Sequence, residues 1–193
     1  MVYTPKILAF AGSARRGSYN KMLVNNAAAG AKADGAKVTL VDLRGFPMPL
    51  YDADLEAADG IPASALEFKK LMASNDGFLI ASPEYNGFFP PLLKNVIDWA
   101  SRRVDDEPAY NGFEGKVAAI MAASPGALGG LRALAHLRTL LANMRVMVLP
   151  DQKGVPNASN AFDDQGVLTD VRTREAVERM GARLAQTLMK LHG

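Results

Sequence analysis

Apolar residues gather in five short runs along the chain, and longer stretches with helical spacing separate these runs. The runs are typical of strands buried on both faces and span residues 7–11, 37–42, 77–82, 116–122 and 146–149. The stretches that predict helices span residues 21–32, 62–73, 90–103, 130–143 and 171–191. Residues 44–60 are rich in Pro, Asp and Gly and are expected to form a long loop, and a polar loop is expected after residue 149.

Strands that alternate with helices in this way predict an α/β protein. Parallel strands need crossovers, and right-handed helical crossovers cover both faces of the sheet, which gives a doubly wound three-layer sandwich. A length of 193 residues suits one domain over residues 1–193. Ligands bind such sheets beyond the carboxyl ends of the strands. The loops after the first, third and fourth strands are therefore where binding residues are expected.

The composition excludes several classes of protein. The chain has no Cys, which excludes disulfides, thiolate metal sites and a cysteine nucleophile. Its net charge of +2 is too balanced to indicate binding to nucleic acid or to an anionic membrane. The first apolar run is too short for a signal peptide, and no stretch is long enough to span a membrane. Asp163 and Asp164 lack the acidic spacing of a calcium loop and are interpreted as a turn. A cytoplasmic protein without a metal site is expected.

The loop over residues 12–20 has the chemistry of an anion site. Its glycines allow a tight turn, its hydroxyl groups can donate to oxygen, and Arg15 can bind a phosphate through its guanidinium fork. The helix that follows presents free N–H groups and a partial positive charge. The alternative is that Ser18 or Asn20 serves only as a helix N-cap. The loop matches neither the P-loop motif, which needs Lys where Ser18 stands, nor G-x-G-x-x-G, because Ala14 replaces the second glycine.

The loop over residues 82–91 combines aromatic residues with small turn residues at the same edge of the sheet. Its prolines, Pro90 and Pro91, suit the first turn of a helix. A flat heteroaromatic ring requires such a site, with backbone groups for its polar edge and aromatic side chains that exclude water. Phe88 and Phe89 are themselves interpreted as anchors of the loop or as part of a subunit contact, since aromatic residues also mark interfaces.

The loop over residues 123–130 contains Ser124 and three glycines directly after the fourth strand. Glycines at such a place allow a ligand to approach the backbone closely. Taken alone, however, this loop is better interpreted as a flexible turn before a helix. Its value as a site depends on the two other loops, which meet it at the same edge of the predicted sheet.

Together, the three loops resemble those of the NADPH-dependent FMN reductase family, which includes chromate, quinone and azo-dye reductases with a flavodoxin-like fold. The resemblance lies in GSARRGSYN at 12–20, SPEYNGFFPPLLKNVIDWASR at 82–102 and SPGALGGLRALAHLRTLL at 124–141, and it extends to FDDQGVLTD at 162–170. The middle segment is the most specific of these. The resemblance implies a five-stranded parallel sheet of order 2-1-3-4-5, a homodimer or homotetramer, and FMN as the cofactor.

The resemblance also implies a role for each loop. The FMN phosphate would be held by Ser13, Arg15, Ser18 and Asn20. The isoalloxazine ring would be lined by Pro83, Glu84, Tyr85, Asn86 and Gly87. The other side of the flavin would be closed by Ser124, Pro125, Gly126 and Gly129. The chain departs from the family pattern at Phe88 and Phe89, where a small or hydroxyl residue followed by an aliphatic residue is expected, so the acceptor pocket is expected to differ.

The implied reaction is a ping-pong hydride transfer from NADPH or NADH through FMN to a small acceptor, such as a quinone, chromate, an azo or nitro compound, or free flavin. FMN supplies the chemistry, so no catalytic side chain is required. Tyr85 is the candidate for contact with the flavin or its guest, and Arg15 and Arg16 are candidates to attract the phosphates of NAD(P)H. His136 lies inside a Leu-rich helix and is interpreted as structural, whereas His192, the penultimate residue, is expected to be disordered.

Two other functions remain open on the sequence. An electron-carrier flavodoxin would share the fold and the FMN without oxidising NAD(P)H itself, although two arginines in the phosphate loop and a positive net charge count against it. A flavin-free nucleotide or sugar-phosphate binder would use the phosphate loop, but the PEYNG segment would then have no evident role in binding. Oxidation of NAD(P)H by the isolated protein would distinguish the reductase from both of these alternatives.

Overall fold

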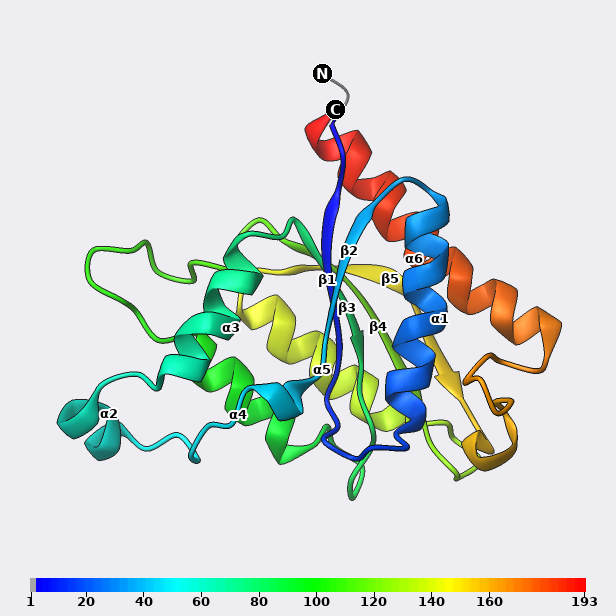
Figure 1. Ribbon diagram of the computed structural model, residues 1–193, viewed down its shortest axis with the longest axis horizontal. Helices are drawn as coiled ribbons and strands as arrows, with labels where there is room; N and C mark the ends of the chain where they lie inside the picture. Colours follow the sequence, from blue (N-terminus) through cyan, green and yellow to red (C-terminus); the bar gives the residue numbers. More distant parts are fainter. Residues whose placement is uncertain (1–2) are drawn as a thin grey trace.

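The computed structural model describes residues 3–193 and shows a parallel sheet between two layers of helices (Figure 1). The strands are β1 (Lys6–Ala11), β2 (Lys37–Val41), β3 (Gly77–Ala81), β4 (Val117–Ala123) and β5 (Met147–Val155). All neighbouring pairs are parallel and their order is β2-β1-β3-β4-β5. The predicted doubly wound α/β fold and its strand order are therefore confirmed.

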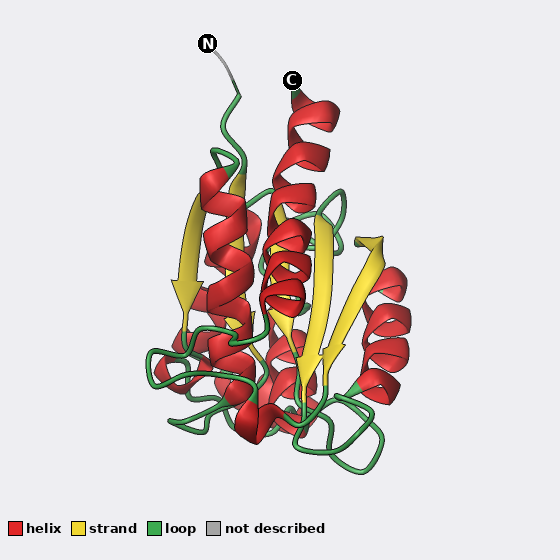
Figure 2. Cartoon of the chain, turned by 90° about the vertical axis from the view of Figure 1, so that its right-hand side faces the viewer, coloured by secondary structure: helices red, strands yellow, loops and turns green. Residues whose placement is uncertain are grey.

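Helices cover both faces of this sheet, as the turned view in Figure 2 shows. The helices are α1 (Tyr19–Ala33), α2 (Ala53–Asp59), α3 (Ala63–Ala73), α4 (Pro91–Ala100), α5 (Leu131–Asn143) and α6 (Val171–His192). One face packs against α1 and α6, and the other packs against α3, α4 and α5. No helix among residues 3–193 combines the length and the apolar character that a membrane crossing requires.

The alternation of side chains along β1 shows how the two cores are filled. Ile7 and Ala9 contribute to the core beneath α1 and α6, whereas Leu8 and Phe10 contribute to the core beneath α3, α4 and α5. Phe10 meets Phe68 of α3 edge to face, with ring centroids 5.3 Å apart. Since both faces are covered, β3 and β4 are buried along their whole length. The continuous apolar runs in the sequence follow from this double burial.

The expected loop over residues 44–60 is partly wrong, because it contains α2. Asp52 caps this helix by accepting a hydrogen bond from the Asp54 N–H at 2.8 Å. None of the α2 residues is buried, so its sequence carries no apolar stripe that would predict a helix. The segment is tied back to the domain where Pro49 O accepts hydrogen bonds from Asn95 and Trp99, each at 2.8 Å.

The last strand is also longer than expected, since β5 continues to Val155 instead of ending at residue 149. Its register against β4 shifts between Ala118 and Ile120, as a bulge in an edge strand does. Pro150 lies within this irregular part, and proline is tolerated only at such edges and bulges. The Arg138 guanidinium donates to the carbonyl oxygens of Val148 and Leu149 at 3.2 and 2.8 Å, which satisfies groups in the bulged region.

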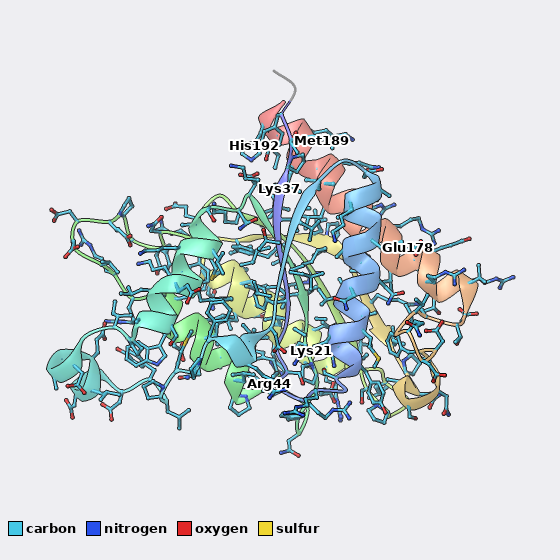
Figure 3. The ribbon with its side chains drawn as sticks, in the orientation of Figure 1. Lys21, Lys37, Arg44, Glu178, Met189 and His192 are labelled. Carbon is cyan, nitrogen blue, oxygen red and sulfur yellow. The ribbon has the colours of Figure 1, made fainter. Side chains whose placement is uncertain are left out.

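The end of the chain lies at the opposite edge of the sheet from the carboxyl ends of the strands. His192 is the last residue of α6, and its ring lies 5.2 Å from the ring of Tyr3, so the expectation that it is disordered is wrong. Figure 3 shows His192 and Met189 near Lys37, at the amino edge, whereas Lys21 and Arg44 lie at the carboxyl edge. The loops at the carboxyl edge are thus separated from the C-terminal end of α6.

Candidate functional site

A cleft of about 350 Å³ lies at the carboxyl edge of the sheet, where the loops after β1, β3 and β4 meet. These loops gather at the lower end of the molecule in Figure 2. The cleft is lined by Ser13, Arg15, Ser18, Tyr19, Asn20, Pro83, Glu84, Tyr85, Ala123, Ser124 and Pro125. Three loops that are far apart in sequence therefore form one site, at the edge where doubly wound sheets bind their ligands.

The first loop leaves a helix N-terminus open toward this cleft. Ser18 is the N-cap of α1, yet its hydroxyl makes no capping hydrogen bond. Ser13 and Ser18 are both buried, so their hydroxyl groups are held among protein atoms rather than in bulk water. The first N–H groups of a helix have no partner within it and carry partial positive charge. An anion bound there completes the hydrogen bonding of the helix end.

Arg15 supplies a full positive charge beside this helix end. Its guanidinium carbon lies 4.7 Å from the ring centroid of Tyr19, and the Tyr19 ring is parallel to that of Phe162 at 6.2 Å. Within residues 3–193, Arg15 forms no ion pair, whereas Lys21 on the same helix end pairs with Asp42 at 2.7 Å. The charge of Arg15 is thus positioned by an aromatic ring and available to an anionic ligand.

Asn20 connects the first loop to the third. Its side-chain amide donates to the Ala123 carbonyl at 2.9 Å, and its amide oxygen accepts from the Ala123 N–H at 2.8 Å. Both partners are buried. Asn20 therefore fixes the end of β4 against the start of α1 and keeps one N–H for a ligand. Its main action in this structure is to hold the two loops at the cleft in register.

The second loop is a tight hairpin that carries Tyr85. The N–H of Tyr85 donates to Phe88 O at 2.9 Å, and the N–H of Phe88 donates to Tyr85 O at 3.1 Å. The two central residues, Asn86 and Gly87, have φ angles of 53° and 84°, as a type I′ turn requires. Asn86 and Gly87 thus form the tip of the hairpin, outside the cleft lining. Tyr85 lines the cleft, and 53% of its surface is exposed.

Glu84 holds this hairpin against the start of α5. Its Oε1 accepts from Arg132 Nε at 2.7 Å, and its Oε2 accepts from the Ala133 N–H at 3.2 Å. Burial by itself raises the pKa of the Glu84 carboxyl, but the hydrogen bonds from Arg132 and Ala133 outweigh it and hold that pKa below its usual range. The carboxylate is therefore a charged anchor that braces one wall of the cleft.

The glycines of the third loop serve the packing of β5. Gly129 has a φ angle of 60°, and a Cβ there would lie 2.7 Å from the Pro156 nitrogen. The Gly126 N–H donates to Ser124 Oγ at 3.2 Å, and the Ser124 N–H donates to Val155 O at 3.1 Å. The close backbone approach is thus made to the end of β5, and neither Gly126 nor Gly129 lines the cleft.

The structure brings most of the predicted site residues together. Nine of the thirteen line the cleft: Ser13, Arg15, Ser18, Asn20, Pro83, Glu84, Tyr85, Ser124 and Pro125. The four that do not are Asn86, Gly87, Gly126 and Gly129. Two lining residues were missed, Tyr19 and Ala123. Tyr19, an aromatic between Ser18 and Asn20, was a detectable signal, whereas Ala123 has no chemical signature and follows only from the end of β4.

Phe88 and Phe89 have different environments. Phe89 is buried in the core beneath α4 and α5, as an anchor of the loop is expected to be. Phe88 remains 45% exposed, and its ring stacks on that of His136 with centroids 4.3 Å apart. His136 is itself exposed on α5, so its place in a Leu-rich helix does not put it in the core.

The donor set of the cleft fits a ligand with an anionic end and a flat ring. The lining combines the serine hydroxyls and the Arg15 guanidinium with the apolar surfaces of Pro83, Tyr85 and Pro125. Across residues 3–193, no group of three or more His, Asp or Glu side chains is arranged to hold a metal ion. The fold and the site together define a flavodoxin-like protein with a cleft at the carboxyl edge of its sheet that suits a ligand with an anionic group.

Comparison with known proteins makes the assignment more specific. The family model for NADPH-dependent FMN reductase matches residues 5–160. An NAD(P)H-dependent FMN reductase of Pseudomonas aeruginosa is 38% identical over 97% of both chains. An NAD(P)H:quinone oxidoreductase of Solanum tuberosum is 35% identical over 97% of this chain and 95% of its own. Among solved structures, the flavoenzyme NAD(P)H:(acceptor) oxidoreductase FerB of Paracoccus denitrificans matches with a TM-score of 0.78 and 26% identity, covering 98% of this chain and 100% of that chain.

The chain belongs to the NADPH-dependent FMN reductase family. The resemblance, the enzyme class and the FMN cofactor expected from the sequence are thereby confirmed.

Proposed function

We propose that this enzyme transfers two electrons from NAD(P)H to a small acceptor by a ping-pong cycle, with a quinone as the preferred acceptor. One observation carries the proposal: the cleft joins an anion-binding end with an unpaired arginine to a ring-sized region that stays open at Tyr85. Ping-pong exchange needs such an opening, because donor and acceptor must occupy the same place in turn. The plant relative is named a quinone oxidoreductase, which supports the choice of acceptor.

Each part of the cleft has a proposed task. Ser13, Arg15 and Ser18 hold the FMN phosphate at the N-terminus of α1. Pro83, Glu84 and Tyr85 line the isoalloxazine ring on one side, while Ser124 and Pro125 close the other side. Asn20 holds the first and third loops at a fixed separation through its two hydrogen bonds to Ala123. FMN, when bound, supplies the hydride chemistry.

Asn86, Gly87, Gly126 and Gly129 are proposed to act through the shape of their loops. The type I′ turn at Asn86 and Gly87 sets the direction in which Tyr85 faces the cleft. Gly129 allows the third loop to lie on the end of β5, which positions Ser124 and Pro125. These residues thus support the site without needing to contact the cofactor through side chains.

The setting of the reaction is also part of the proposal. We infer a single domain that acts in the cytoplasm as a homodimer or homotetramer. A net charge of +2 and the absence of cysteine support a small-molecule enzyme in a reducing compartment. The partly exposed rings of Tyr85 and Phe88 lie where either an acceptor or a second subunit would cover them.

The experiment that tests this function is an anaerobic titration of the FMN-loaded protein, followed by its visible absorption. Bleaching of the flavin bands by NADPH or NADH, and recovery on addition of a quinone, are expected. Flavin bands that neither nucleotide bleaches would instead identify an electron carrier. A protein that binds no FMN would be a binder of another phosphate ligand.

A further inference from the structure

An aromatic surface extends beyond the cleft along the hairpin and onto α5. It consists of Tyr85, Phe88 and His136, and we call it the aromatic strip. Tyr85 and Phe88 are 53% and 45% exposed, and His136 is exposed as well. Large exposed rings beside a binding cleft are unusual enough to indicate contact with a ligand or a partner.

Hairpin geometry places Phe88 next to the cleft. Tyr85 and Phe88 exchange both backbone hydrogen bonds across the turn, and residues directly opposite each other in an antiparallel pair place their side chains on the same face. Because Tyr85 lines the cleft, this pairing puts the ring of Phe88 on the face of the hairpin that carries Tyr85. The strip therefore continues the cleft wall outward.

Two successive contacts hold the strip rigid. Arg132 and His136 are one helical turn apart on α5, so they face the same direction. Arg132 holds Glu84 of the hairpin, and His136 stacks on Phe88 with an interplanar angle of 29°. Phe88 also contacts the buried Phe89, with ring centroids 4.4 Å apart. The ring is thus positioned from two sides and still exposed, so a ligand that stacks on it requires little reordering.

We propose that the aromatic strip selects flat aromatic acceptors over small oxyanions. This inference rests on the proposed function and names the class of acceptor that the site favours. Offset stacking on Phe88 stabilises a fused aromatic ring such as a naphthoquinone. A hydrated oxyanion such as chromate gains nothing from an apolar ring. The strip therefore lowers the concentration of flat acceptor needed for reaction and leaves that of chromate unchanged.

The test follows reoxidation of the FMN-loaded protein after reduction with dithionite, so it does not depend on NAD(P)H. In Phe88→Ser, the acceptor concentration at half-maximal rate should rise roughly 3- to 10-fold for a naphthoquinone, as the loss of one aromatic contact predicts. The value for chromate should stay unchanged. Phe88→Trp should retain the preference. Leu191→Ser, which alters an exposed apolar side chain at the far end of α6, is the matched control.

Equilibrium binding gives a second measurement without turnover. The affinity of the oxidised, FMN-loaded protein for naphthalene-2-carboxylate, a flat and redox-inactive compound, should fall by a similar factor in Phe88→Ser and not in Leu191→Ser. Equal shifts for naphthoquinone and chromate would overturn the proposal. So would a change in sedimentation mass without any change in acceptor preference, which would assign the strip to a second copy of the chain. Failure of NADPH to reduce the flavin would contradict the proposed function. The acceptor preference measured after dithionite reduction would still stand, because that measurement does not use NADPH.

Discussion

Two cations near the N-terminus of α1 show how a single contact separates a ligand-binding residue from a structural one. Lys21 is neutralised by Asp42 at 2.7 Å. Arg15 lies over the Tyr19 ring and has no carboxylate partner within residues 3–193. The resemblance to the family assigns Arg15 to the phosphate, but the basic character of the two residues alone does not distinguish them. The position of Asp42 at the end of β2, which only the folded sheet brings to Lys21, makes the difference.

Arg15→Ala is expected to weaken FMN binding about tenfold, because a charge-assisted hydrogen bond contributes roughly 1.5 kcal/mol at the lower end of its range. The lower end applies because Arg15 is exposed. Fluorescence titration of the apoprotein with FMN measures the effect. Arg16→Ala, its exposed neighbour outside the cleft lining, is the matched control and should change affinity far less. Equal losses in the two variants would indicate general charge attraction instead of a specific contact.

Elements meet at the cleft through side chains that satisfy backbone groups. Asn20 joins α1 to the end of β4, and Glu84 joins the second loop to α5. The sequence predicted these residues as parts of a site, and the structure shows that each also holds two elements together. Asn20 is bound by the backbone of Ala123, and Glu84 by the backbone of Ala133 as well as by the Arg132 side chain. The two alanines have no functional side chain, so no sequence pattern marks the backbone pairing. The elements themselves were predictable where an apolar stripe existed and were missed at α2, which buries none of its residues.

Asn20→Ala should lower the free energy of unfolding by about 3 kcal/mol, because it leaves the buried N–H and C=O of Ala123 without partners. Urea denaturation measures the loss. Asn25→Ala, an exposed position on the same helix, should be neutral or slightly stabilising, since alanine favours the helix. A loss in Asn25→Ala as large as that in Asn20→Ala would contradict the bridging role.

Glu84 gives the site a predicted pH dependence. Because its pKa in the folded protein is below the unfolded value of about 4.3, the ionised carboxylate stabilises the fold fully above that unfolded pKa. This stabilisation is lost as the pH falls through the folded-state pKa. Glu84→Gln should therefore be less stable than the parent at pH 7, and the difference should shrink on acidification.

Urea midpoints of the parent and Glu84→Gln between pH 3.5 and pH 7 check this dependence. Glu175→Gln is the control, because Glu175 forms an exposed pair with Arg179 at 3.5 Å and such pairs contribute little. A stability difference for Glu84→Gln that is independent of pH would show that the carboxylate charge is not what anchors the hairpin.

At the scale of the whole molecule, the layer formed by α1 and α6 depends on two glycines. A Cβ on Gly30 of α1 would overlap the carbonyl oxygen of Glu178, and a Cβ on Gly181 of α6 would overlap that of Ala27. Figure 1 shows the two helices side by side over one face of the sheet, and Figure 3 marks Glu178 on the α6 side of this contact. The close approach lets α1 and α6 pack side by side on the same core.

Gly181→Ala is therefore expected to lower the free energy of unfolding by about 3 kcal/mol, because the added methyl group forces the backbones of α1 and α6 apart. FMN affinity of the folded fraction should change little, since the contact lies away from the cleft. Gly45→Ala, where an added Cβ meets nothing within 4 Å, is the control and should be neutral. Urea denaturation measures the loss. An unaltered urea midpoint in Gly181→Ala would contradict the role of this close contact in stability.

The sequence by itself determined the doubly wound sheet, because buried parallel strands and amphipathic helices leave distinct hydrophobic periods. It also determined the family and most of the cleft, because three polar, Gly- or Pro-containing loops follow three strands whose carboxyl ends must share one edge. Tertiary structure alone decided which residues of those loops reach the cleft. Gly129, for example, lies against the end of β5 because of backbone packing between segments that are distant in the sequence. Such contacts depend on positions in space that local sequence patterns do not encode.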